Sequence, residues 1–181
     1  IDAARRGLAA SQHESVLYLG ARVLLHAGDA DGMEEVAVRL ENRLQSQTTA
    51  LAGLLRGERA LTEDHRPEAV RVLREAWQES DIWFARYLLG RAYLEVGHLP
   101  EALDELDACV RRKGEITDVF LVDSATLRHY PPALYWLGRV EEAMGSRDAA
   151  AERYRNFLEL RSAADTPDEL ADDAAERLGS S

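Results

Sequence analysis

The sequence predicts an all-α protein, built as an array of about four helical hairpins and closed by a C-terminal helix. Ala, Leu, Arg and Glu dominate the composition whereas Ile, Phe and Thr are scarce, which favours helix over strand. Apolar residues make up 46% of the 181 residues, which excludes an intrinsically disordered chain. Similar segments recur along the chain, and each holds two helical patterns separated by a short turn.

The clearest recurrence relates residues 57–69 to residues 90–102, which align without a gap at a spacing of 33 residues. Each copy predicts a helix, a short turn, Pro at the first helical position and a second helix. A further copy starts at Pro131, and a weaker one lies upstream around Gly28. The predicted repeats cover about residues 14–47, 50–82, 83–116 and 131–164 of a single domain that spans residues 1–181.

Within each copy a small residue is followed by a turn Gly, then by Ala, a large apolar residue and Ala. This order resembles the tetratricopeptide repeat, which implies a right-handed α-α superhelix, or solenoid, with close helix contacts at the small positions. The large residues are expected to fill the gap to the next hairpin. The small positions are Ala21, Gly57, Gly90, Gly138, Ala69, Ala102 and Ala150, and the large ones are Leu73, Leu106 and Tyr154. The second copy has Asp64 where the turn Gly belongs. Other helical-pair repeats are an alternative, although their period is usually longer.

The array needs polar caps because a hairpin at either end has no neighbour to cover its apolar face. Thr166 to Glu169 reads as a capping box with Pro167 at the first helical position, which predicts a capping helix over residues 167–178. Residues 2–12 predict a short helix or the end of an upstream hairpin. Since the first residue is Ile1 rather than Met, we expect the chain to be part of a longer protein.

An insertion at residues 114–130 interrupts the period between the third and fourth repeats. It carries the apolar run from Val119 to Val122. One interpretation is a lid that packs over the array and buries these side chains, and the other is a protrusion that binds a partner. An exposed run of four apolar residues promotes aggregation, which favours the lid.

Composition and motifs argue against several functions. The net charge of −11 argues against nucleic acid as a partner, because duplex binding requires a basic surface. Cys109 is the single cysteine, so no disulfide or cysteine-based zinc site is expected. No pair of histidines has ligand spacing, and no catalytic or phosphate-binding motif is present. We therefore expect no enzyme activity, cofactor or metal, and no apolar run is long enough for membrane insertion.

In three of the four predicted hairpins, the first helix carries a Tyr and an Arg four residues apart at the same positions of the repeat. The second repeat has Leu54 and Glu58 at these two positions. In tetratricopeptide arrays these positions line the concave groove in which peptide ligands lie. The resemblance therefore implies a partner-binding surface made of Tyr18, Arg22, Glu58, Tyr87, Arg91, Tyr135 and Arg139. Tyr and Arg are also enriched at interfaces. The alternative is an internal ladder of ion pairs in which Arg22, Glu58 and Arg91 pair and each Tyr packs on the next helix.

The last third of the chain, from about Leu106 to Leu178, resembles repeat regions that bacterial multidomain signalling proteins append to Ser/Thr kinase or cyclase domains. The residues of this resemblance include the Tyr-Pro-Pro-Ala-Leu-Tyr-Trp-Leu-Gly-Arg segment from Tyr130 to Arg139. It implies a cytoplasmic module of a larger bacterial signalling protein, or an extracytoplasmic one if a transmembrane segment precedes it.

Two functions remain from the sequence. The first is a non-catalytic scaffold that binds a peptide or protein segment in its groove, and the second is a self-association element that forms a homo-oligomer without a separate ligand. A sensor regulated by a small molecule is a third possibility, although no residue points to one.

Overall fold

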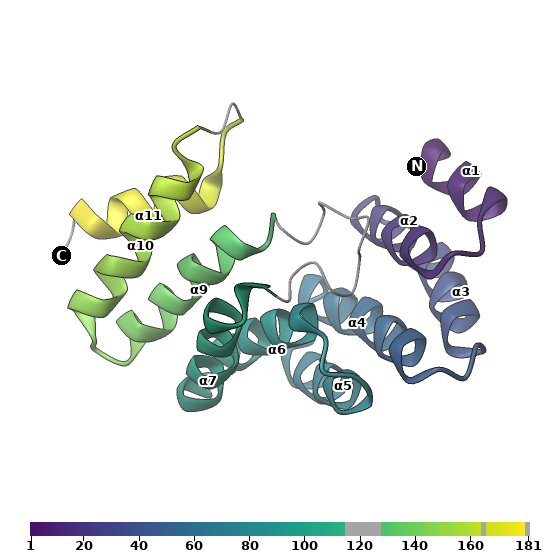
Figure 1. The fold of residues 1–181 in the computed structure, drawn as a ribbon, viewed down its shortest axis with the longest axis horizontal. Helices are drawn as coiled ribbons and strands as arrows, with labels where there is room; N and C mark the ends of the chain where they lie inside the picture. The colour runs from purple at the N-terminus through teal and green to yellow at the C-terminus, as the bar shows by residue number, and fades with distance from the viewer. Residues whose placement is uncertain (115–127, 164–165, 180–181) are drawn as a thin grey trace. The chain divides into compact units, whose positions relative to one another are not determined.

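The computed structural model describes residues 1–114, 128–163 and 166–179, and these residues contain helices and no strand (Figure 1). The predicted all-α fold of helical hairpins is thereby confirmed. The helices are α1 (Asp2–Ala10), α2 (Glu14–His26), α3 (Ala30–Glu41), α4 (Ser46–Thr62), α5 (Arg66–Glu79), α6 (Trp83–Glu95), α7 (Leu99–Arg111), α9 (Tyr130–Ala143), α10 (Arg147–Arg161) and α11 (Glu169–Gly179).

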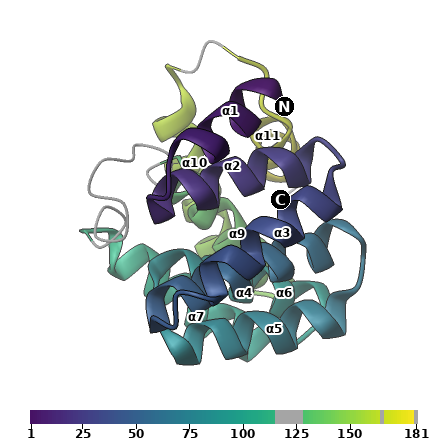
Figure 2. The ribbon, with the colours of Figure 1, turned by 90° about the vertical axis from the view of Figure 1, so that its right-hand side faces the viewer.

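The chain forms two compact units, residues 1–92 and residues 93–181, and each is described by itself. In the first unit α1 packs on α2, α2 on α3, α3 on α4, and α4 on α5. The two first helices α2 and α4 also touch, so that the hairpins lie side by side (Figures 1 and 2). In the second unit α7 packs on α9, α9 on α10, and α10 on α11. The single domain over residues 1–181 stays a prediction.

All four hairpin turns have the same backbone hydrogen bonds, which explains why the turn pattern was legible in the sequence. In each turn one N–H donates to the carbonyl five residues earlier, as from Asp29 to Leu24 at 2.9 Å and from His65 to Ala60 at 2.8 Å. The preceding N–H donates to the carbonyl three residues earlier. This pair of bonds is the Schellman motif, which satisfies the last carbonyls of a helix and requires a left-handed residue between the two helices.

The left-handed position is Gly28, Gly97 or Gly145 in three of the turns, with φ between 77° and 82°. In the second hairpin it is Asp64, which adopts φ of 62° although a side chain disfavours this conformation. The turn therefore has the same backbone conformation as the other three, although it lacks the glycine. Asp64 is exposed, and its carboxylate lies 2.7 Å from the Arg66 guanidinium.

Asp64→Gly is expected to raise the free energy of unfolding by about 0.5–1 kcal/mol, because glycine enters the left-handed region without a steric penalty. The lost surface ion pair with Arg66 is worth little by comparison. Gly97→Ala, the converse change in an equivalent turn, is expected to cost about 1–2 kcal/mol. Chemical denaturation followed by circular dichroism measures both, and a destabilised Asp64→Gly protein would contradict the shared turn geometry.

The glycines at two of the predicted small positions lie beneath the large residue of their own hairpin. A Cβ atom on Gly57 would lie 2.3 Å from Cδ2 of Leu73, and one on Gly138 would lie 2.8 Å from Cε1 of Tyr154. The predicted close approach of helices is thus present at both glycines. The large residue packs within its own hairpin, where the missing Cβ makes room for it, and Tyr154 also belongs to the buried cluster that includes Ala174 of α11.

The helix starts differ in detail from the sequence prediction. Pro67, Pro100 and Pro131 each occupy the second helical position rather than the first, where a missing N–H is equally harmless. The C-terminal helix α11 begins at Glu169, and its cap is Asp168 instead of Thr166. The Asp168 side chain accepts a hydrogen bond from the Leu170 N–H at 3.0 Å, so the predicted capping box does not form.

The N-terminal helix α1 is a short helix, which is one of the two structures predicted for residues 2–12. Leu8 is its buried residue, and a Cβ on Gly20 of α2 would lie 2.7 Å from the Leu8 side chain. The insertion at residues 114–130, including Val119 to Val122, falls mostly on residues 115–127 and lies outside the described residues. None of the helices in the described parts is both long and apolar enough to cross a membrane.

Candidate functional site

The three Tyr–Arg pairs of the first helices have one common geometry. In each pair the guanidinium lies over the ring of the tyrosine four residues earlier, at the outer limit of a cation–π contact. The distances from Cζ to the ring centroid are 6.0 Å for Arg22 over Tyr18, 5.7 Å for Arg91 over Tyr87 and 6.0 Å for Arg139 over Tyr135. The i,i+4 spacing therefore places both members on one helix face, as the sequence predicts.

In the first unit, Arg22 of α2 forms a buried ion pair with Glu58 of α4. Arg22 Nε donates to Oε2 and Nη2 donates to Oε1, both at 2.7 Å, so the pair is bidentate. Both side chains are 9% exposed. The two residues occupy equivalent positions of consecutive first helices, which is the arrangement that the ladder alternative predicts for them.

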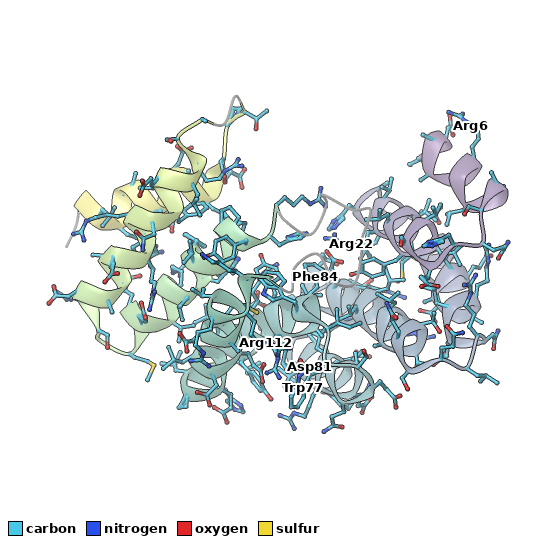
Figure 3. All side chains as sticks on the ribbon, in the orientation of Figure 1. Arg6, Arg22, Trp77, Asp81, Phe84 and Arg112 are labelled. Carbon is cyan, nitrogen blue, oxygen red and sulfur yellow. The ribbon has the colours of Figure 1, made fainter. Side chains whose placement is uncertain are left out.

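Aromatic rings and a histidine complete the surroundings of this pair. The Arg22 guanidinium also lies 5.0 Å from the Phe84 ring centroid, and the two side chains approach each other in Figure 3. The Nε2 atom of His26 lies 3.2 Å from Oε1 of Glu58, and His26 is 53% exposed. The buried pair is therefore bounded by α2, α4 and α6, with His26 on its solvent side.

The ion pair has a marked effect on the ionisation of Glu58. Burial opposes the charged form, but hydrogen bonds from His26 and Arg22 outweigh it and lower the pKa of Glu58 to about 2. Because the folded-state pKa lies below the ordinary value of 4.5, the stabilisation is fully present above about pH 5. It is lost progressively as the pH falls from about 5 towards 2.

Glu58→Gln is therefore expected to lose a pH-dependent stabilisation on the order of 3 kcal/mol at neutral pH. The difference in unfolding free energy between wild type and variant should shrink between about pH 5 and pH 3, because protonated Glu58 resembles Gln. Urea denaturation at several pH values measures it. Glu75→Gln, which removes a carboxylate from an exposed pair with Arg71, serves as the control. A difference that is the same at both ends of this range would contradict the assignment.

The seven predicted groove residues fall into a buried set of five and a partly exposed set of two. Tyr18, Arg22, Glu58, Tyr87 and Tyr135 are 1–7% exposed. Arg91 and Arg139 are partly exposed, and the Arg139 side chain is 32% exposed. Five of the predicted contacts therefore belong to the packing of the units. Of the seven, only Arg91 and Arg139 retain partial exposure.

In the second unit, Tyr135 and Arg139 of α9 meet Asp173 of α11. The Tyr135 hydroxyl donates to Oδ2 of Asp173 at 2.7 Å, and Arg139 Nη1 donates to the same hydroxyl at 3.0 Å. Burial raises the pKa of Tyr135, and its bond to the Asp173 carboxylate raises it further. Arg139 lies 4.0 Å from Asp173, so a cation of a first helix again faces a carboxylate of the next helix but one in the chain.

A second set of contacts joins α11 to α9 and α10. Arg177 Nη1 donates to Oε2 of Glu142 at 2.7 Å, and the Tyr154 hydroxyl donates to the same oxygen at 2.9 Å. Arg177 Nε also donates to Asp173 at 2.5 Å, and this bond is the main cause that lowers the pKa of Asp173. No sequence motif identifies Glu142, Asp173 or Arg177. They meet Tyr135 and Arg139 only because α11 packs against α9 and α10.

A cluster outside the register was also missed. Trp77, Asp81 and Arg86 join the end of α5 to α6, and Figure 3 shows Trp77 and Asp81. The Arg86 guanidinium lies 4.9 Å from the Trp77 ring centroid, and its Nε donates to Asp81 at 2.7 Å. The Trp77 indole N–H donates to the same carboxylate at 3.1 Å. These bonds connect the end of α5 to the start of α6.

The charged surface of the second helices offers shallow depressions. Two of them, about 350 and 460 Å³ in volume, share Arg56, Arg71 and Val72. Arg56 is held between Glu34 at 2.8 Å and Glu41 at 3.1 Å, and Arg71 lies 3.0 Å from Glu75. These arginines already have carboxylate partners. No group of metal-binding side chains is found among the described residues.

Repeated Schellman turns, glycines beneath large side chains and equivalent polar positions on successive first helices define a tetratricopeptide-like helical repeat protein. A solved structure described as the crystal structure of MamA, a protein of this fold, matches with a TM-score of 0.56 and 19% sequence identity. The alignment covers 88% of this chain and 90% of the MamA chain. No protein-family model matches the chain, and no curated protein matches it. The likeness establishes the fold.

Proposed function

We propose that the chain is a non-catalytic scaffold that binds a peptide or protein segment along the exposed part of its first-helix register. The observation that supports this most strongly is the recurrence of a guanidinium over a buried tyrosine ring in three first helices. A guanidinium placed in this way loses little conformational freedom when it binds a carboxylate or a backbone carbonyl. The two of these arginines that are partly exposed, Arg91 and Arg139, favour a directed contact over a diffuse charged surface.

The arginines have different roles in this proposal. Arg22 already has a bidentate carboxylate partner and is buried, so its role is to hold α2 against α4. Arg91 is partly exposed over the buried Tyr87 ring and is the residue of the first unit that we assign to partner contact. Arg139 has the same role in the second unit, where it lies at the edge of α11.

The expected partner is an extended or helical segment with a carboxylate that contacts Arg91 of the first unit or Arg139 of the second. Such a partner would approach a protein of net charge −11, so attraction must be local to the arginines and weaken with added salt. The resemblance of the last third to bacterial signalling proteins supports a docking role within a larger protein of that kind.

The test is a selection from a displayed library of random peptides of roughly 16 residues, followed by fluorescence anisotropy with the strongest binder. Arg91→Glu is expected to weaken that binder by at least about 10-fold while circular dichroism shows that the fold is retained. Arg74→Glu, on the exposed face of α5, is the matched control. A binder that has equal affinity for wild type and Arg91→Glu would refute the assignment. Arg139→Glu is a poorer test, since Asp173 and Glu142 lie within 4.0 Å of Arg139.

Self-association is the second candidate, because a fold of this kind also suits assembly. Static light scattering over a wide concentration range distinguishes the two candidates. A strictly monomeric chain that binds selected peptides supports the first. A dimer or larger oligomer that selected peptides leave intact supports the second.

A further inference from the structure

Helix α11 lies on an apolar surface of the second unit that holds large aromatic residues. Tyr135, Tyr154 and Phe157 are 0–2% exposed, and Ala174 of α11 is buried in the same cluster. Leu170, Ala171 and Leu178 of α11 pack against it while remaining partly exposed. The apolar face of α11 thus consists of two leucines and two alanines over a mainly aromatic floor.

Three polar contacts join α11 and its cap to this surface in a fixed order along the chain. Asp168 lies 2.7 Å from Arg161, Asp173 accepts from Tyr135 at 2.7 Å, and Arg177 lies 2.7 Å from Glu142. The receiving surface therefore presents a cation, then a hydroxyl with Arg139 beside it, then a carboxylate. This order is complementary to a helix that carries two acidic residues followed by a basic one.

The attachment of α11 is weak for the surface that it covers. The helix has 11 residues, and Ala174 is its one fully buried side chain. Isolated helices of this length are marginal in water, so packing must hold α11 in place. The charged members of its three contacts are 21–36% exposed, and ion pairs with that exposure contribute little and are screened by salt.

We propose that the face of α9 and α10 beneath α11 is a docking site for an acidic amphipathic helix of a partner protein, and that α11 occupies it until the partner displaces it. The argument for this occupant is charge complementarity, because α11 itself is acidic at Glu169, Asp172, Asp173 and Glu176 and is already seated there. The proposal rests on the proposed function, since Tyr135 and Arg139 of the first-helix register belong to this face.

Seven residues, 162–168, separate α10 from α11, so α11 competes for the face as a covalently attached ligand. A short covalent connection gives an attached helix an effective concentration in the millimolar range. A free helix of similar intrinsic affinity at micromolar concentration therefore binds weakly to the closed protein. A substitution that weakens the packing of α11 should expose the face of α9 and α10 and reveal its full affinity for a free helix.

The probe is a fluorescein-labelled synthetic peptide of residues 166–179, tested in fluorescence anisotropy against the full chain. Ala174→Glu places a carboxylate in the buried cluster and should displace α11 without altering the receiving face. Asp173→Asn with Arg177→Gln is a second, milder variant that removes two of the three polar contacts. Both variants are expected to bind the peptide at least about 10-fold more tightly than the wild type does. A peptide with Lys in place of every Asp and Glu is expected not to bind.

Specificity is tested by a charge exchange across the interface. Glu142→Arg, introduced with Ala174→Glu, should weaken the native peptide, and a peptide with Arg177→Glu should restore binding. Hydrogen exchange reports in the same samples whether residues 169–179 are released while α9 and α10 stay protected. Released α11 with no gain in peptide affinity overturns the proposal. A dimer of the milder variant that excess peptide does not dissociate also overturns it, because the occupant is then a second copy of the chain.

The result can be separated from the test of the proposed function. Arg91 lies in the first unit, so Arg91→Glu is expected to leave the binding of the α11 peptide to the Ala174→Glu protein unchanged. Loss of selected binders in Arg91→Glu and capture of the α11 peptide by the second unit are thus independent outcomes.

Discussion

Glu58→Gln is expected to lower the free energy of unfolding by about 3 kcal/mol at neutral pH, because it leaves the buried Arg22 guanidinium without its carboxylate. Arg22 and Glu58 are each 7% exposed, so water replaces the lost partner poorly. His26 lies 3.2 Å from Glu58, and it cannot replace the lost carboxylate because an imidazole is neutral or cationic. Urea denaturation followed by circular dichroism measures the change.

A double replacement separates the worth of the pair from the cost of breaking it. Arg22→Met with Glu58→Leu removes both charges and fills the space with apolar side chains, and it is expected to lie within about 1 kcal/mol of wild type. The single change Arg22→Met should be as damaging as Glu58→Gln. A Glu58→Gln protein that loses less than about 1 kcal/mol would contradict the buried, bidentate geometry.

Leu73→Ala is expected to cost about 2–5 kcal/mol, because Leu73 is fully buried and its removal opens a cavity above Gly57. Gly57→Ala is expected to cost about 1–3 kcal/mol, since the new Cβ would lie 2.3 Å from Cδ2 of Leu73. The methyl group gained at residue 57 partly fills the cavity left at residue 73. The double variant should therefore lose less than the sum of the two single losses.

The control for this cycle is Val72→Ala, one residue away on the half-buried side of α5, with an expected loss below about 1 kcal/mol. Thermal and chemical denaturation of the four proteins give the coupling energy. Strictly additive losses would mean that Gly57 and Leu73 do not share the space that the structure gives them.

The helices and turns were predictable because their determinants are local. Three turn glycines and an apolar period of helical spacing specify the hairpins, and Asp64 adopts the same left-handed turn without changing the pattern. The start of α11 was less predictable. Thr166 and Asp168 are both good capping residues, and a bond from Leu170 together with the contact to Arg161 settles the choice on Asp168.

The positions of the Tyr, Arg and Glu side chains on the first helices were predictable, but the burial of each side chain was not. Tyr–Arg spacing fixes the helix face, whereas the depth of each side chain depends on which helix packs against it. Glu58 reaches Arg22 because α4 packs on α2, and nothing local to residue 22 or 58 specifies that contact. Likewise Asp173 meets Tyr135 through a residue separation of 38, beyond the reach of any local pattern.

The measurement that tests the account most directly is the affinity of one selected peptide for three proteins: wild type, Arg91→Glu, and Arg22→Met with Glu58→Leu. In the proposed function Arg91 contacts the partner, whereas the Arg22–Glu58 pair stabilises the fold. We therefore expect a loss of at least about 10-fold in Arg91→Glu and a change within about 3-fold in the double variant. Equal losses in both variants, or no loss in Arg91→Glu, would contradict the proposed function.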